Sequence, residues 1–115
     1  MNELASMHCS AITANTPKLN AQDIHLYLAE LPTWQVYEKD GEPRLEKVFY
    51  FKDFTQALDF TNRVAQTVNQ EDHHPAILTE WGKVTITWWT HRIRGLHLND
   101  FIMAAKTDQL YGESS

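Results

Sequence analysis

Three histidines stand at positions where imidazole chemistry would be useful. His73 and His74 are adjacent in the run Glu71-Asp72-His73-His74-Pro75, and His91 follows at the distance of one hairpin. An imidazole titrates near neutrality, so two of them can supply a proton donor and a proton acceptor at about pH 7. Unrelated surface histidines are the alternative interpretation of the adjacent pair.

The residues after the adjacent pair predict a hairpin. Pro75 favours an extended backbone at His74 and ends any helix that precedes it. Residues 76–81 and 83–91 are rich in Ile, Val, Thr and Trp and flank Gly82, which is typical of two strands joined by a tight turn.

The register of this hairpin would bring the histidines together. If Glu80 faces Lys83, residues whose numbers sum to roughly 163 lie opposite each other. Opposed side chains lie about 5 Å apart and diagonal neighbours about 7–8 Å apart. The pairs at the open end of the hairpin are then His91 with Asp72 and Trp89 with His74.

The second strand of the hairpin has one apolar and one polar face, because side chains alternate along a strand. We expect the apolar face in the core and the polar face, which carries one large ring, to stay open to a ligand. The core face consists of Val84, Ile86 and Trp88, and the open face of Lys83, Thr85, Thr87, Trp89 and His91. The alternative for His91 is a structural histidine satisfied by one hydrogen bond.

Two helices and one more hairpin are expected before this site. Asn20 can cap a helix that Pro32 ends. Asp53 and Gln56 fit a capping box that opens a long helix to about Asn69. The first hairpin should consist of residues 34–37 and about 45–51, and the stripe of the long helix should be Phe54, Ala57, Leu58, Thr61, Val64, Ala65 and Val68.

A last helix completes an α-β-β-α-β-β-α order. Asn99 or Asp100 can cap this helix, which should run from about Phe101 to Leu110. Hairpins and sheet-crossing helices predict an α+β fold, in which three helices pack on one face of a four-stranded, mostly antiparallel sheet. The other face is then free for a ligand or a partner subunit.

Length and charge are typical of one small enzyme or binding domain. The chain has 115 residues, and we expect one domain at 19–111 between flexible ends at 1–18 and 112–115. Its net charge of −5 argues against general nucleic-acid binding, which requires a basic surface. The single Cys9 cannot form an internal disulfide, and no apolar run approaches the ~20 residues of a membrane span. Without a signal-peptide pattern, we expect a cytoplasmic protein with no membrane partner.

At this point the spacing resembles that of a known family, the pterin-4a-carbinolamine dehydratases. The resemblance covers roughly residues 19 to 111 and includes the junction Phe49-Tyr50-Phe51-Lys52-Asp53-Phe54. The motif residues that match are Trp34, His73, His74, Pro75, Trp81, His91 and Asp100.

The resemblance implies an activity and a site. The reaction is loss of water from 4a-hydroxytetrahydropterin, which needs one proton donor and one acceptor but neither metal nor organic cofactor. The resemblance assigns His73 and His91 to proton transfer and His74 to substrate binding and orientation. It also implies recycling of the pterin cofactor of aromatic amino acid hydroxylases, and a homodimer or homotetramer.

The other motif residues would form or support the pterin site. Trp34 is the candidate ring against the flat pterin, with Trp81 or Trp89 as further walls. Asp100 is expected to cap the last helix, and as a motif residue it would contribute to substrate binding or orient a site group.

One position departs from the family pattern, and two other functions stay open. The family usually has a charged residue four positions before the first histidine, where this chain has Asn69, and we expect Glu71 or Asp72 to take that role. Three histidines also suit zinc, although no cysteine is near them in the sequence. Finally, some members of the family act without catalysis, as dimerisation partners of a homeodomain transcription factor or as assembly factors, because a fold alone does not fix function.

Overall fold

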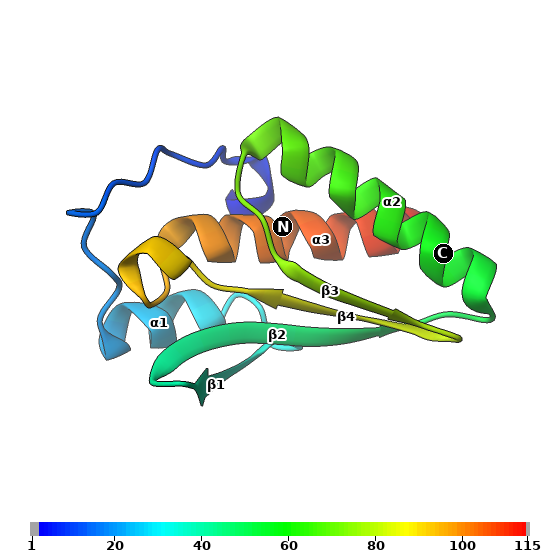
Figure 1. The fold of residues 1–115 in the computed structure, drawn as a ribbon, viewed down its shortest axis with the longest axis horizontal. Helices are drawn as coiled ribbons and strands as arrows, with labels where there is room; N and C mark the ends of the chain where they lie inside the picture. The colour runs from blue at the N-terminus through cyan, green and yellow to red at the C-terminus, as the bar shows by residue number, and fades with distance from the viewer. Residues whose placement is uncertain (1–2, 115) are drawn as a thin grey trace.

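The structure, a computed structural model, describes residues 3–114, in which three helices cover one face of a four-stranded sheet (Figure 1). This is the α+β arrangement that the sequence predicts. In chain order the elements are η1 (Glu3–Ser6), α1 (Ala21–Leu28), β1 (Gln35–Lys39), β2 (Glu42–Tyr50), α2 (Phe54–Glu71), β3 (Ala76–Glu80), β4 (Lys83–Trp88), η2 (His91–Ile93) and α3 (Leu98–Ser114), where η marks a 3-10 turn.

The sheet has the order β1-β2-β4-β3 and every pairing is antiparallel. In the second hairpin Glu80 faces Lys83 and Ala76 faces Thr87, so the predicted register is confirmed over both strands. The ladder ends there, because β4 stops at Trp88 and the chain turns into η2 at His91. The expected continuation of the pairing to His91 and Asp72 is therefore wrong.

The first hairpin has a two-residue turn and starts its second strand earlier than expected. Asp40 and Gly41 have φ angles of 55° and 76°, as both central residues of this turn type require. Pro43 belongs to β2, where it faces Glu38. A proline is tolerated here because its nitrogen points away from β1, and β2 pairs with β4 only from Leu45 onward.

Side chains cap α1 and α2 as predicted. The side chain of Asn20 accepts a hydrogen bond from the Asp23 N–H at the start of α1, and Asp53 accepts one from the Gln56 N–H at the start of α2. Helix α2 ends where Asp72 adopts the left-handed conformation (φ 53°), with its N–H donating to the carbonyl oxygen of Val68. This sharp end directs the chain from α2 straight into the histidine pair.

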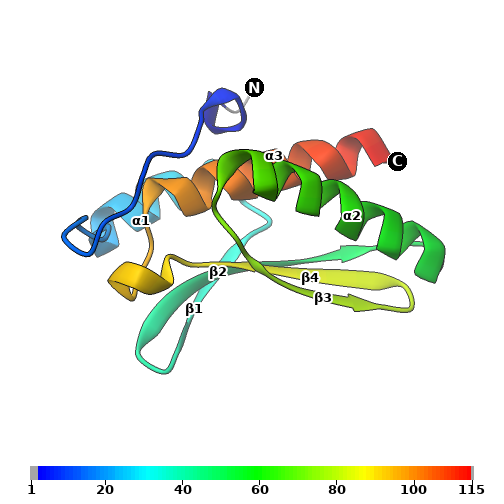
Figure 2. The ribbon, with the colours of Figure 1, turned by 45° about the horizontal axis from the view of Figure 1, so that its top comes forward.

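The core lies between the sheet and the helices (Figure 2). Val84, Ile86 and Trp88 of β4 are fully buried there, as the alternation predicts. The face of α2 that meets the sheet is rotated from the predicted stripe: Phe54 and Leu58, which were expected on it, are about 40% exposed. The residues that α2 buries are Ala57, Phe60, Val64 and Val68.

Both ends of the chain contain more structure than expected. Leu4 in η1 is 3% exposed and packs in the core, and Lys106 of α3 donates a hydrogen bond to the carbonyl oxygen of Ala5. Helix α3 begins at Leu98 and continues to Ser114, beyond the predicted end at Leu110; residues 1, 2 and 115 lie outside the described residues. Over the described residues, no helix is long and apolar enough to cross a membrane.

Candidate active site

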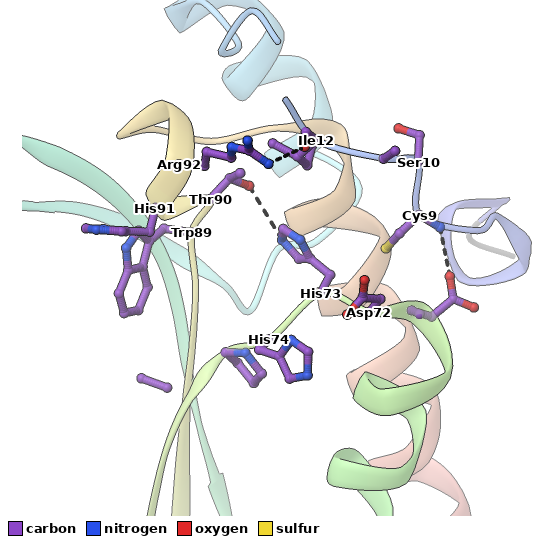
Figure 3. Close-up of a pocket in the computed structure, with 14 residues that line it drawn as sticks. Cys9, Ser10, Ile12, Asp72, His73, His74, Trp89, Thr90, His91 and Arg92 are labelled. Carbon is purple, nitrogen blue, oxygen red and sulfur yellow. Dashed lines mark hydrogen bonds between the residues drawn. The ribbon is translucent and has the colours of Figure 1, made fainter. Parts of the chain in front are cut away.

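A pocket of about 710 Å³ opens where the end of α2, the adjoining ends of β3 and β4, η2 and the N-terminal segment meet (Figure 3). This size is ordinary for a small-molecule site. All three histidines predicted for the site contribute to it. Its lining residues are Cys9, Ser10, Ala11, Ile12, Glu71, Asp72, His73, His74, Pro75, Ala76, Trp89, Thr90, His91 and Arg92.

His73 is the most firmly held of the three histidines. It follows the left-handed Asp72, it is 8% exposed, and its ring lies nearly parallel to that of Trp88, with centroids 5.9 Å apart. Its Nε2 lies 2.7 Å from Oδ1 of Asp100. An ionised carboxylate only accepts, so His73 donates through Nε2–H and its Nδ1 carries the lone pair.

Asp100 is fully buried behind His73 and does not line the pocket. Its carboxylate accepts from His73, from Thr90 Oγ1 at 2.8 Å and from the His97 N–H at 2.9 Å. The last bond caps α3 from inside its first turn. Asp100 therefore contacts His73 and orients its ring, while a direct contact of Asp100 with a substrate stays a prediction.

His74 and His91 lie at the pocket surface. His74 is exposed and is a lining residue of the pocket, next to His73 in the chain (Figure 3). The side chain of His91 is 85% exposed, and its Nδ1 lies 3.8 Å from Oε1 of Glu42. His91 is therefore not the buried structural histidine of the alternative interpretation.

The carboxylate of Glu42 lies close to three basic side chains on this side of the pocket. Its side chain is 6% exposed, and it lies 3.9 Å from Arg44 and 3.6 Å from Arg94 as well as near His91. The guanidinium of Arg44 lies over the ring of Trp89, 4.0 Å from its centroid. Within the described residues, neither Oε1 of Glu42 nor Nε of Arg44 has a hydrogen-bond partner.

Only one of the three tryptophans considered for stacking lines the pocket. Trp34 is 3% exposed, packs edge-on against Phe49 and donates through Nε1 to Asp108. Its ring is therefore turned into the core. Trp81 is 72% exposed at the tip of the second hairpin, one strand of five residues or roughly 16 Å from the histidines. Within the described residues, Trp89 is therefore the tryptophan that lines the pocket, and the stacking of any of these rings on a pterin stays a prediction.

Neither Asn69 nor Glu71 supports a pocket histidine. Asn69 is exposed and outside the pocket. Both carboxylate oxygens of Glu71 are taken by the N-terminal segment: Oε1 accepts the Cys9 N–H at 2.7 Å and Oε2 accepts from His8 at 2.8 Å. The bond from the Cys9 N–H is the main reason that the pKa of Glu71 lies below its usual range.

Sequence reasoning missed Thr90, His97, Glu42 and the N-terminal residues of the pocket. His97 is the N-terminal cap of α3, since its Nδ1 accepts the Asn99 N–H at 3.0 Å. Burial lowers the pKa of His97, against the attraction of Asp100. A clue was present, because a histidine three residues before an aspartate resembles a capping box.

The arrangement combines a histidine–aspartate pair, a second exposed histidine and an aromatic wall around one cavity. Such a set can take a proton from one atom of a bound molecule and give a proton to another. Within residues 3–114, no three histidine, cysteine or carboxylate side chains converge as a metal centre requires.

Comparison with known proteins gives the family. Residues 17–110 match the family model described as pterin 4 alpha carbinolamine dehydratase. A protein of Marinobacter nauticus, provisionally named a pterin-4-alpha-carbinolamine dehydratase, is 52% identical over 111 residues, which are 96% of this chain and 100% of that protein.

Two solved structures share the fold. The crystal structure of a transcriptional coactivator/pterin dehydratase from Brucella melitensis has a TM-score of 0.75 at 30% identity and covers 84% of this chain and 100% of its own. A pterin dehydratase-like protein, identified as a RuBisCO assembly factor in the alpha-carboxysome, has a TM-score of 0.59 at 26% identity and covers 70% and 90%. The chain with this histidine-lined pocket belongs to the pterin-4-alpha-carbinolamine dehydratase family.

Proposed function

We propose that this protein dehydrates 4a-hydroxytetrahydropterin to the quinonoid dihydropterin and water, as a hydro-lyase. The observation that carries the proposal is the convergence of His73, His74 and His91 on one pocket of small-molecule size. The membership of the family supports the reaction class. The step breaks the C4a–O bond and removes the N5 proton, so two proton transfers complete it without any change of oxidation state.

We assign His73 to the removal of the N5 proton. Its Nε2–H donates to Asp100, so Nδ1 is the nitrogen that can accept. Within the described residues Nδ1 makes no hydrogen bond of its own. The buried carboxylate also stabilises the imidazolium that forms when the proton arrives, as in other histidine–aspartate pairs.

We assign His91 to the protonation of the C4a hydroxyl, which then leaves as water. His91 is free to reach a substrate because its side chain is 85% exposed, and its Nδ1 lies 3.8 Å from Oε1 of Glu42. His74 would bind and orient the pterin, and the Trp89 ring would pack against the flat heterocycle.

The expected cellular role is the recycling of the pterin cofactor of aromatic amino acid hydroxylases, in the cytoplasm and as a homodimer or homotetramer. The recycling role and the oligomer follow from the family resemblance, and the location follows from the lack of a signal-peptide pattern in the sequence.

The test is stopped-flow dehydration of synthetic 4a-hydroxytetrahydropterin by purified protein. The chelator-treated protein should accelerate the reaction at its full rate, because the proposed chemistry uses only imidazoles. A rate lost on chelation and restored by zinc would make the histidines metal ligands. A rate equal to that of buffer at every protein concentration would reject the dehydratase.

A non-catalytic role as a protein-binding or assembly factor is the second candidate. One observation favours it: the helix-free face of the sheet presents large exposed apolar side chains, including Leu78 at 57% and Tyr50 at 67% exposure. In addition, a protein with a similar fold has been identified as a RuBisCO assembly factor. Normal folding without any dehydration would favour this candidate.

A further inference from the structure

The N-terminal residues 8–12, here called the strap, form one wall of the pocket. Cys9, Ser10, Ala11 and Ile12 line it, although the match to the family model begins only at residue 17. Figure 3 shows Cys9 on one side of His73 and Trp89 on the other. A flat ligand that reaches His73 therefore has the strap on one flank and the aromatic ring on the other.

Two side chains of the helical layer hold the strap in place. Glu71, whose side chain is 10% exposed, accepts from the Cys9 N–H and from His8. Asn99, which is 1% exposed, pairs twice with the backbone of Ser10: Oδ1 accepts the N–H at 3.0 Å and Nδ2 donates to the carbonyl oxygen at 2.8 Å.

Further contacts attach the chain before and after the residues that Glu71 and Asn99 bind. Arg92 of η2 donates to the Ile12 carbonyl oxygen at 3.1 Å, which joins the strap to the turn that carries His91. Before the strap, η1 is held by the buried Leu4. Because a handful of hydrogen bonds offsets the entropy cost of ordering this irregular segment, the loss of one of them should weaken the docking.

Cys9 reports on the docking, since it is the single cysteine of the chain. Burial, with the nearby charges of Glu71 and Asp100, raises the pKa of its thiol to about 12. A docked strap therefore keeps Cys9 a neutral and poorly reactive thiol, whereas a released strap would expose an ordinary one.

We propose that the strap is a substrate-binding wall that sets the affinity for the pterin, and that Glu71 and Asn99 are positioning residues that act through it. This inference rests on the proposed function. It implies that the strap affects binding and leaves the proton transfers to the histidines unchanged, because none of its side chains contacts His73 or His91 by a hydrogen bond within the described residues.

The test uses two variants, each of which removes a hydrogen bond to a different one of the two residues that hold the strap. Glu71→Ala removes the acceptor on α2, and Ser10→Pro removes the N–H that Asn99 binds. Gln70→Ala is the matched control, because Gln70 is exposed beside Glu71 and lies outside the pocket. Each protein is measured for kcat and KM of dehydration, for Kd of a stable reduced pterin by calorimetry, and for alkylation of Cys9 by iodoacetamide.

Both loosening variants should raise KM and Kd by about tenfold, the effect of one or two lost hydrogen bonds, with kcat within about twofold. Alkylation of Cys9 should become at least about tenfold faster, and the pterin should slow it in the unmodified protein. Faster alkylation with unchanged KM and Kd would overturn the proposal, as would a fall in kcat alone or no change in any measurement. A protein that binds the pterin but does not dehydrate its substrate would reject the proposed function and leave the binding comparison decisive for the strap.

Discussion

The two sides of the pocket hold their histidines in opposite ways. His73 is 8% exposed, stacks on Trp88 and has a hydrogen bond of 2.7 Å to a carboxylate that is itself saturated by Thr90 and the α3 backbone. His91 is 85% exposed and has only a 3.8 Å approach to Glu42. One imidazole is built into the fold and the other stands on a short surface turn.

This difference suggests a division of labour. A group fixed in advance loses little entropy in the reaction, and the buried carboxylate determines which nitrogen of His73 faces the substrate. The exposed His91 must be ordered by the pterin itself. Substitutions on the His73 side should therefore affect folding and rate together, whereas those on the His91 side should affect the rate alone.

The largest expected effects are those of removing either histidine. His73→Ala and His91→Ala should each lower the dehydration rate constant by about 10²-fold or more if each transfers a proton. Only His73→Ala should also lower the free energy of unfolding, measured by urea denaturation, because only His73 is buried. The exposed His25→Ala on α1 serves as a control. A full rate in His91→Ala would remove that side of the pocket from the chemistry.

Asp100→Asn should have the next largest effect. It keeps the shape but weakens the bond to His73, and it leaves buried donors poorly matched. We expect loss of about 1–3 kcal/mol of stability together with a fall in kcat of about tenfold or more. Stopped-flow kinetics and urea denaturation measure both. A stable variant with an unchanged kcat would mean that the pair with His73 is only structural.

On the other side, Glu42→Gln should have a smaller effect that is specific to the rate. The substitution removes the charge that faces His91 while it keeps the size of the side chain. We expect kcat to fall by about twofold to fivefold, because an ion pair with a solvent-exposed partner contributes at most about 1 kcal/mol. Arg94→Gln, which also changes a neighbour of Glu42 but is itself 72% exposed, should leave kcat unchanged. Equal losses in both variants would indicate a general effect on η2.

The expected effect that is smallest near neutral pH is a change in the pH dependence of stability from Cys9, on the buried side. Its pKa is raised from 9.0 to about 12, so the folded protein keeps a proton that the unfolded chain loses. Stability should therefore be constant below about pH 9 and fall as the pH rises towards 12. Thiolate absorbance followed against pH should show no titration of Cys9 near 9 in the folded protein. Titration at the ordinary value would mean that the strap is not docked.

Much of the fold could be predicted because it follows from local rules. Asn20 and Asp53 indicate two helix starts because their side chains can cap a helix, and the Trp81-Gly82 turn fixes the register of the second hairpin. The rotation of α2 was missed because periodicity alone did not show which of two overlapping stripes meets the sheet, and Phe54 and Leu58 were assigned to the wrong side.

The convergence of three histidines on one pocket was predictable, whereas the residues that support them were not. His73, His74 and His91 converge through one hairpin, which is a short-range property of the sequence. The strap, which lines the pocket, and Glu42, which lies 3.8 Å from His91, come from distant segments, and nothing in their local sequence marks them. For the same reason the buried position of the Trp34 ring could not be derived from its place before β1.

The most direct test of the account is a crystal structure of the protein with a stable reduced pterin bound. The ring should lie between Trp89 and residues 8–12, with its reacting edge within hydrogen-bond distance of Nδ1 of His73 on one side and of His91 on the other. A pterin on the helix-free face of the sheet beside Trp81, or in any position that leaves His73 and His91 out of reach, would contradict it.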